Sequence, residues 1–131
     1  MLYCADPHKN GVYEIKDDQG KLWRKETYNE GRLIHMEHYY ENGQMRHRYN
    51  LQSGKKEGLY EEWYENGQLR TRCYYKNNLQ HGLYESWHSN GQISFQCNYI
   101  EGQKAGLMTE WNDRGYITQK QFYPHINQSD I

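Results

Sequence analysis

Residues 58–81 read GLYEEWYENGQLRTRCYYKNNLQH. One alternating run of apolar and polar residues leads into Asn66-Gly67, and a second run leads away from it. Asn-Gly between two such runs is the strongest short-range signal for a β-hairpin, because both central residues of a type I′ turn need positive φ. The stretch therefore predicts two antiparallel strands joined by a tight, two-residue turn.

The same pattern recurs along the whole chain. Asn42-Gly43 and Asn90-Gly91 stand at the same place in neighbouring copies, and Gln19-Gly20 and Arg114-Gly115 stand there in the first and last copies. A fixed period of this length indicates a repeat architecture. We divide the chain into a lead-in or cap, five copies and a C-terminal tail: 1–10, then 11–33, 34–57, 58–81, 82–105 and 106–123, then 124–131.

The period predicts the fold class. We expect an all-β protein: a single-layer, elongated antiparallel meander of about five β-hairpin repeats of 24 residues. Each copy has a tight turn at its Asn-Gly step and a looser turn that links it to the next copy. The two prolines, Pro7 and Pro124, lie near the ends, so none interrupts strand pairing between them.

A two-residue turn also fixes the register of each hairpin. In the third copy it places Trp63 opposite Arg70, Glu61 opposite Arg72 and Tyr60 opposite Cys73. The Glu61–Arg72 pair recurs as Glu14–Lys25, Glu37–Arg48 and the half-neutralised Glu85–Gln96. Side chains alternate between faces along a strand. One face then carries Tyr60, Leu69 and Tyr75, and we expect it to pack on itself. The other carries Trp63, Arg70 and the row Tyr39, Trp63, Trp87 and Trp111.

Composition argues against several classes of partner. The formal net charge is −1 and no basic stripe is present, which argues against nucleic acid and anionic membranes as partners. No apolar run has the length of a membrane span, and the first residues lack the pattern of a signal peptide. These features predict a cytoplasmic protein. In that setting we expect Cys4, Cys73 and Cys97 to be free thiols.

The recurring residues resemble MORN repeats, and most closely the variant MORN repeat of bacterial and large-DNA-virus proteins. They are the Asn-Gly steps, with Tyr64-Glu65-Asn66-Gly67 as the fullest example, and the glycines that open copies, Gly58, Gly82 and Gly106. The resemblance implies an elongated, twisted sheet of hairpins that acts as a scaffold, a dimerisation device or a partner-binding surface. The resemblance also suggests membrane attachment or an antitoxin role, because these functions have been assigned to some family members.

Catalytic chemistry has no support in the sequence. No phosphate-binding loop and no metalloprotease or hydrolase motif is present, so we expect no catalytic, cofactor-binding or metal-binding residues and no enzymatic activity. Of the seven histidines, His38 and His47 face each other in the predicted register. We interpret them as a surface pair, because two ligands fall short of the sites that hold zinc.

We expect a non-enzymatic scaffold that mediates protein–protein interaction or self-association through the aromatic and arginine face or through a sheet edge. Trp, Tyr and Arg are the residues most enriched at binding hot spots. The candidate partner-binding residues are Tyr39, Trp63, Arg70, Trp87 and Trp111. The partner is a protein of unknown identity or a second copy in a homodimer. The alternatives are an antitoxin-like inhibitor of one cognate protein and, with less support, a membrane-surface or lipid-binding module.

Overall fold

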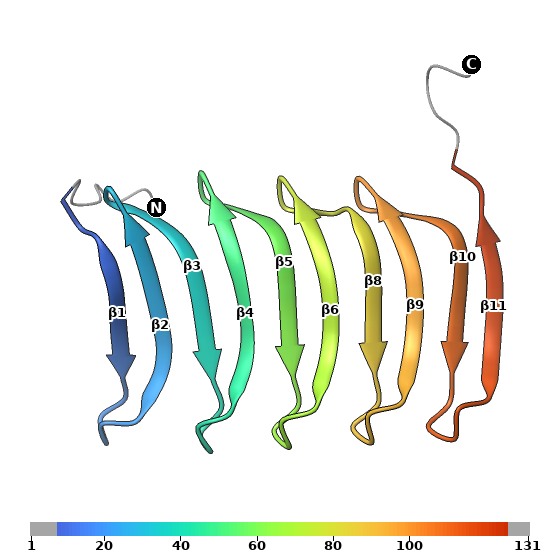
Figure 1. The fold of residues 1–131 in the computed structure, drawn as a ribbon, viewed down its shortest axis with the longest axis horizontal. Helices are drawn as coiled ribbons and strands as arrows, with labels where there is room; N and C mark the ends of the chain where they lie inside the picture. Colours follow the sequence, from blue (N-terminus) through green and yellow to red (C-terminus); the bar gives the residue numbers. More distant parts are fainter. Residues whose placement is uncertain (1–7, 126–131) are drawn as a thin grey trace.

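The computed structural model describes residues 8–125, which form one open sheet of eleven antiparallel strands (Figure 1). The strands are β1 (Gly11–Lys16), β2 (Leu22–Asn29), β3 (Arg32–Tyr39), β4 (Met45–Gln52), β5 (Lys55–Trp63), β6 (Leu69–Lys76), β7 (Leu79–Gln80), β8 (Gly82–Trp87), β9 (Ile93–Ile100), β10 (Gln103–Trp111) and β11 (Ile117–Tyr123).

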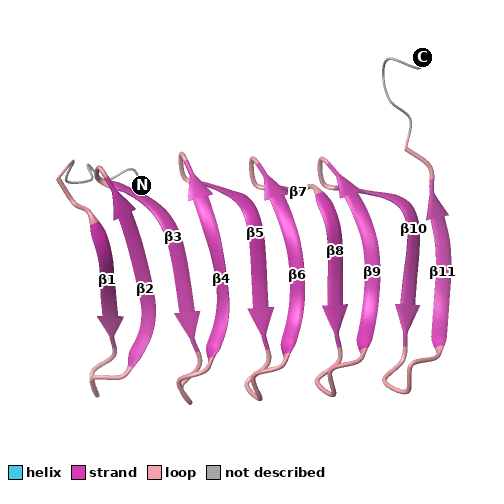
Figure 2. Ribbon diagram, in the orientation of Figure 1, coloured by secondary structure: helices cyan, strands magenta, loops and turns pink. Residues whose placement is uncertain are grey.

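Neighbouring strands follow one another in chain order along the longest axis of the molecule (Figure 1). The short β7 pairs with β6 and is followed by β8 in the same place, so the two are pieces of one interrupted strand (Figure 2). No other layer of secondary structure covers the sheet within residues 8–125. The predicted fold class, a single-layer meander of hairpin repeats, is confirmed. The same part of the chain contains no helix that is long and apolar enough to cross a membrane.

The turns within the copies differ from the prediction. Gly67 donates its N–H to the carbonyl of Tyr64 at 3.0 Å, and Tyr64 donates its own to the carbonyl of Gln68 at 2.9 Å. Gly67 has a φ of 88°, but Asn66 is absent from the described residues with positive φ. This is a type I turn followed by a left-handed glycine, and the predicted type I′ turn is wrong. The Oδ1 atom of Asn66 accepts the N–H of Gln68 at 2.9 Å, which favours this longer loop.

The type I′ turns lie instead between the copies, where we expected looser links. Both central residues have positive φ, as that turn requires. The pairs are Glu30-Gly31 (50° and 79°), Ser53-Gly54 (52° and 79°), Asn77-Asn78 (52° and 71°) and Glu101-Gly102 (48° and 85°). The flanking residues pair directly, as Gln52 does with Lys55. Each link is therefore as tight as a hairpin loop can be.

Every hairpin carries one β-bulge beside its turn. In the third copy Glu62 pairs with Thr71 but Trp63 pairs with Leu69, which leaves Arg70 without a partner in the ladder. The other copies shift at the same place, and their extra residues are Trp23, Arg46, Ser94 and Thr118. The predicted pairs Glu61–Arg72 and Tyr60–Cys73 are confirmed. The predicted Trp63–Arg70 pair is wrong, because the longer turn and the bulge displace the register only near the turn.

A second kind of bulge separates the copies. Tyr49 pairs with Tyr60 and Leu51 with Lys56, so the register moves by two residues around Gly58. The first junction moves by only one residue, between the Tyr28–Leu33 and Thr27–His35 pairs, and Ile34 stands there in place of glycine. Gly58 has a φ of 85°, which side chains rarely adopt, and Ile34 has no positive φ. The smaller bulge explains why the first copy is one residue short.

Pairing assigns side chains to two faces. The tyrosine face carries Tyr49, Tyr60, Cys73, Tyr84 and Cys97, and the tryptophan face carries Glu61, Trp63, Arg72, Trp87 and Trp111. The tyrosine face packs on itself as predicted: ring centroids lie 5.8 Å apart for Tyr49–Tyr60 and 5.6 Å apart for Tyr60–Tyr75. Leu69 does not belong there, since it pairs with Trp63.

The most deeply buried side chains lie on the tyrosine face. Met108, Cys73 and Cys97 are 2%, 2% and 1% exposed. Cys73 and Cys97 are free, as predicted, and burial raises the pKa of the Cys73 thiol to about 11. Both thiols are thus structural. Cys4 lies outside the described residues.

Candidate protein-binding surface

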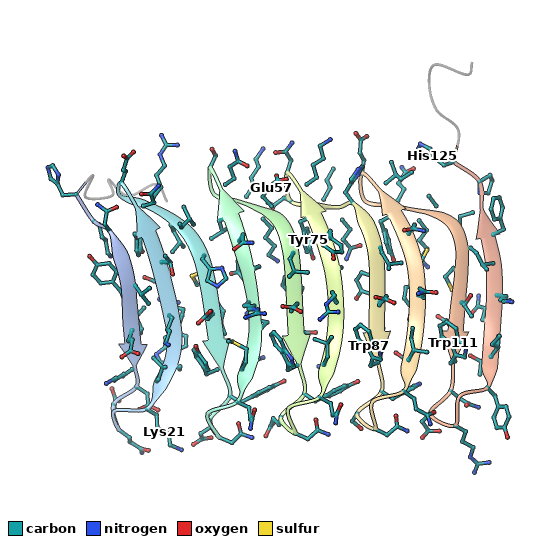
Figure 3. The ribbon with its side chains drawn as sticks, in the orientation of Figure 1. Lys21, Glu57, Tyr75, Trp87, Trp111 and His125 are labelled. Atoms are coloured by element: carbon teal, nitrogen blue, oxygen red, sulfur yellow. The ribbon has the colours of Figure 1, made fainter. Side chains whose placement is uncertain are left out.

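Four aromatic residues form a row across the tryptophan face. This tryptophan row consists of Tyr39, Trp63, Trp87 and Trp111, the last residues of β3, β5, β8 and β10. Figure 3 shows Trp87 and Trp111 at the same level, next to the turns. Neighbours in the row are two strands apart, or roughly 9–10 Å.

Each member of the row pairs with an apolar residue of the following strand. The partners are Met45, Leu69, Ile93 and Ile117 in that order. The four aromatic side chains are half-buried against these neighbours and keep part of their surface open. The result is a continuous apolar strip along one margin of the face.

The backbone beneath the row is fixed by the preceding copy. The hydroxyl of Tyr40 donates to the carbonyl of Trp63 at 2.6 Å, and that of Tyr64 donates to the carbonyl of Trp87 at 2.6 Å. A ring nitrogen of His88 lies 2.9 Å from the carbonyl of Trp111. Each copy thus positions the tryptophan of the next, and the row is held in place before any partner arrives.

Asparagines tie the turns together in the same way. The Nδ2 atom of Asn42 donates to the carbonyl of Glu65 at 2.9 Å, Asn66 to Ser89 at 3.0 Å and Asn90 to Asp113 at 2.9 Å. In the first copy, where Gln19 replaces the asparagine, Lys21 reaches the carbonyl of Glu41 at 3.1 Å. The turns beside the apolar strip are therefore joined to one another by hydrogen bonds between neighbouring copies.

A row of charged and polar residues crosses the middle of the tryptophan face. Its centre is Glu61, which accepts hydrogen bonds from Arg48 at 2.8 and 2.9 Å and from Arg72 at 2.9 and 3.1 Å. Burial raises the pKa of the Glu61 carboxyl, but the hydrogen bonds and charges of the two arginines outweigh burial, so the pKa is lowered. The predicted Glu14–Lys25 and Glu85–Gln96 contacts are present at 4.0 and 3.0 Å.

Arginines contribute differently from the prediction. Arg70 lies 3.8 Å from Glu62 and over the Tyr64 ring, which puts it on the tyrosine face. Arg70 and the tryptophan row therefore lie on opposite faces of the sheet. Arg48 instead lies over the Trp63 ring, 5.4 Å from its centroid. Sequence reasoning missed Arg48 as a site residue, although its pairing with Glu37 and its period with Arg72 were visible there.

The two facing histidines are neighbours on the tyrosine face. The ring centroids of His38 and His47 lie 4.2 Å apart. Burial, followed by the charges of His47, Arg24 and Arg46, lowers the pKa of His38 to about 4. Within residues 8–125 no three metal-ligating side chains come together, so this pair has no third ligand in that part of the chain.

An open sheet of repeated hairpins with an aromatic strip held in place is typical of repeat proteins that act as scaffolds. The sequence matches the MORN repeat variant over residues 9–30, 33–52, 56–77 and 80–101, which is more than half of the chain. The chain therefore belongs to the MORN repeat family. Repeats of this family generally form non-enzymatic scaffolds for interaction with proteins or membranes. No curated protein matches the sequence significantly.

Proposed function

We propose that this protein is a scaffold that binds a protein partner through the tryptophan row. The observation that carries the proposal is the rigid, half-open strip of four aromatic residues, each seated on an apolar neighbour. Large aromatic side chains held in one conformation lose little entropy on binding and are enriched at hot spots. The row of charged and polar residues centred on Glu61 lies on the same face. Its polar groups would fix the orientation of a bound partner.

Two more specific roles, inhibition of one cognate protein and membrane binding, are separate proposals. A single cognate target would make the chain an antitoxin-like inhibitor, and a cytoplasmic location fits either role. Membrane binding has less support, because the net charge is −1 and the exposed cations alternate with anions on the tryptophan face. Flotation with vesicles of anionic lipid tests it, and co-migration of the protein would favour membrane binding.

The test compares a double variant with a matched control. Trp63→Ala with Trp87→Ala removes the middle of the row, and Trp23→Ala removes a tryptophan outside it that is 41% exposed. Each protein is immobilised, and proteins captured from extracts of the native cell are quantified by mass spectrometry. The captured protein is then purified, and its affinity for the wild type and the variants is measured.

We expect the double variant to bind that protein at least about tenfold more weakly, and Trp23→Ala to bind it as the wild type does. Thermal unfolding must show that both variants are folded. Equal affinity of the double variant and the wild type would contradict the proposed role of the row.

A further inference from the structure

The two ends of the sheet are open. Among residues 8–125, β1 and β11 each have a neighbouring strand on one side only. Both terminal strands expose an apolar side chain among their polar ones: Val12 on β1 is 60% exposed and Phe122 on β11 is 66% exposed. Unpaired strand edges invite pairing with another chain.

Inside the sheet, the second strand of each copy pairs with the first strand of the next copy. β11 is the second strand of the last copy and β1 the first strand of the first, so these junctions show how the two could pair. At three of the four junctions between copies, a cation of the earlier copy lies opposite an anion of the later one: Lys25 opposite Glu37, Arg48 opposite Glu61 and Arg72 opposite Glu85. At the fourth junction Gln96 lies opposite Thr109. At the ends of this row stand Glu14, which pairs with Lys25, and Lys120, which pairs with Thr109. The row begins with an anion and ends with a cation.

The turn positions match as well. Val12 and Phe122 do not face each other in the register of the internal junctions, because a bulge falls there at junctions that open with a glycine: Asn98, the counterpart of Phe122, pairs with Ala105. At the turns, Asn90 donates to the carbonyl of Asp113 in the next copy. Arg114 occupies the asparagine position of the last copy, and Asp18 occupies the Asp113 position of the first.

We propose that the β11 edge of one molecule pairs with the β1 edge of a second copy of this chain, in the register of the internal junctions. Lys120 then faces Glu14, and the Arg114 guanidinium reaches Asp18. The two surfaces differ, so the contact is heterologous and leaves one open edge at each end of the pair. Further copies extend the same sheet. The tryptophan row stays uncovered, so this contact is independent of the proposed function.

Charge reversal tests the proposal. Glu14→Lys places two lysines at the contact, and Lys120→Glu places two carboxylates there. A mixture of the two variants restores opposite charges, because the lysine introduced on the β1 edge of one protein meets the carboxylate introduced on the β11 edge of the other. The matched controls are Glu65→Lys and Lys76→Glu, which make the same charge changes at exposed positions away from both edges.

The measurement is the weight-average mass by sedimentation equilibrium at low salt, up to about 1 mM protein, the weak end of specific association. We expect the mass of the wild type and of both controls to rise steadily with concentration. Each end variant alone should associate about tenfold more weakly, and the equimolar mixture should recover the wild-type curve.

Other outcomes overturn the proposal. They are a wild type that remains a single chain throughout, a mass that stops at two chains, end variants that associate like the wild type, and a mixture that does not recover. None of them affects the capture experiment on the tryptophan row.

Discussion

Glu61 is 3% exposed, although no second layer covers the sheet in the described part of the chain, residues 8–125. The guanidinium groups of Arg48 and Arg72, on the two adjacent strands, lie 2.8 and 2.9 Å from its carboxylate oxygens. A buried carboxylate is tolerable only when its lone pairs are satisfied, and here both oxygens accept hydrogen bonds. The middle of the tryptophan face is therefore held by charge-assisted hydrogen bonds.

Glu61→Gln should lower the free energy of unfolding by about 1–3 kcal/mol, because it leaves two arginines without their shared anion. Glu85→Gln is the control, since Glu85 receives its 3.0 Å hydrogen bond from the neutral Gln96 and is only half-buried. Urea unfolding at neutral pH measures both. Equal losses for the two variants would show that the double clamp on Glu61 adds nothing.

His38 should make stability depend on pH. Its pKa is lowered to about 4 in the folded state from an ordinary 6.5, so the unfolded chain binds more protons between these values. Stability therefore falls as the pH drops from about 6.5 to about 4, and this group causes no further loss below that. Melting temperatures of the wild type and of His38→Phe at pH 7 and pH 5 test this.

The His38→Phe variant should lose less stability between the two pH values than the wild type. It keeps part of the dependence, because burial lowers the pKa of His47 as well. His125→Phe, outside the sheet, is the control and should behave as the wild type. If the pH dependence of stability were unchanged in His38→Phe, His38 would not be a cause of it.

At the scale of the hairpin, each turn depends on its neighbour. Asn66 shows both contacts: Oδ1 accepts the N–H of Gln68, and Nδ2 donates to the carbonyl of Ser89 in the following copy. One side chain thus sets the local turn and joins two copies. The repeated Asn-Gly step is explained by both roles.

Asn66→Ala should cost about 1 kcal/mol of stability, since two exposed hydrogen bonds are lost. Asn66→Asp keeps the acceptor and loses the donor, so its stability should fall between those of the wild type and Asn66→Ala. Gln19→Ala is the control, because Lys21 makes the corresponding contact in the first copy. Chemical denaturation ranks the variants, and a loss for Gln19→Ala as large as for Asn66→Ala would contradict the role of the asparagines.

The strands and most of their pairs were predictable from the sequence, but the turns were not. The Glu61–Arg72 pair follows from alternation and period, which are properties of many residues together. The bulge at Arg70 is a one-residue feature, and the preference for the longer loop depends on contacts between copies such as Asn66 with Ser89. Four of the five candidate residues share one face as predicted. Arg70 does not, because the bulge turns it over.

At the scale of the whole molecule, each copy contacts only its neighbours along the chain. Stability should then be close to a sum of hairpin terms and junction terms. Removal of residues 58–81 joins Glu57 to Gly82 and brings Arg48 opposite Glu85, a pair of the same kind as the one it replaces.

The shortened chain should fold with the same far-ultraviolet spectrum per residue. Its dependence of unfolding free energy on urea should decrease roughly in proportion to length. Removal of residues 58–69 is the control: it deletes one strand, reverses the direction of all later strands and should prevent folding of the C-terminal part. Loss of structure in the 24-residue deletion would show that the copies are not interchangeable.

The central claim is that a single open layer leaves the tryptophan row accessible. Small-angle X-ray scattering with light scattering on dilute protein tests it most directly. The account predicts a mass of 15.9 kDa and a flat, elongated particle, whose radius of gyration exceeds the about 14 Å of a compact 131-residue domain. A compact particle, or a dimer of fixed mass and twice the thickness, would mean that a face of the sheet is already covered and would contradict the claim.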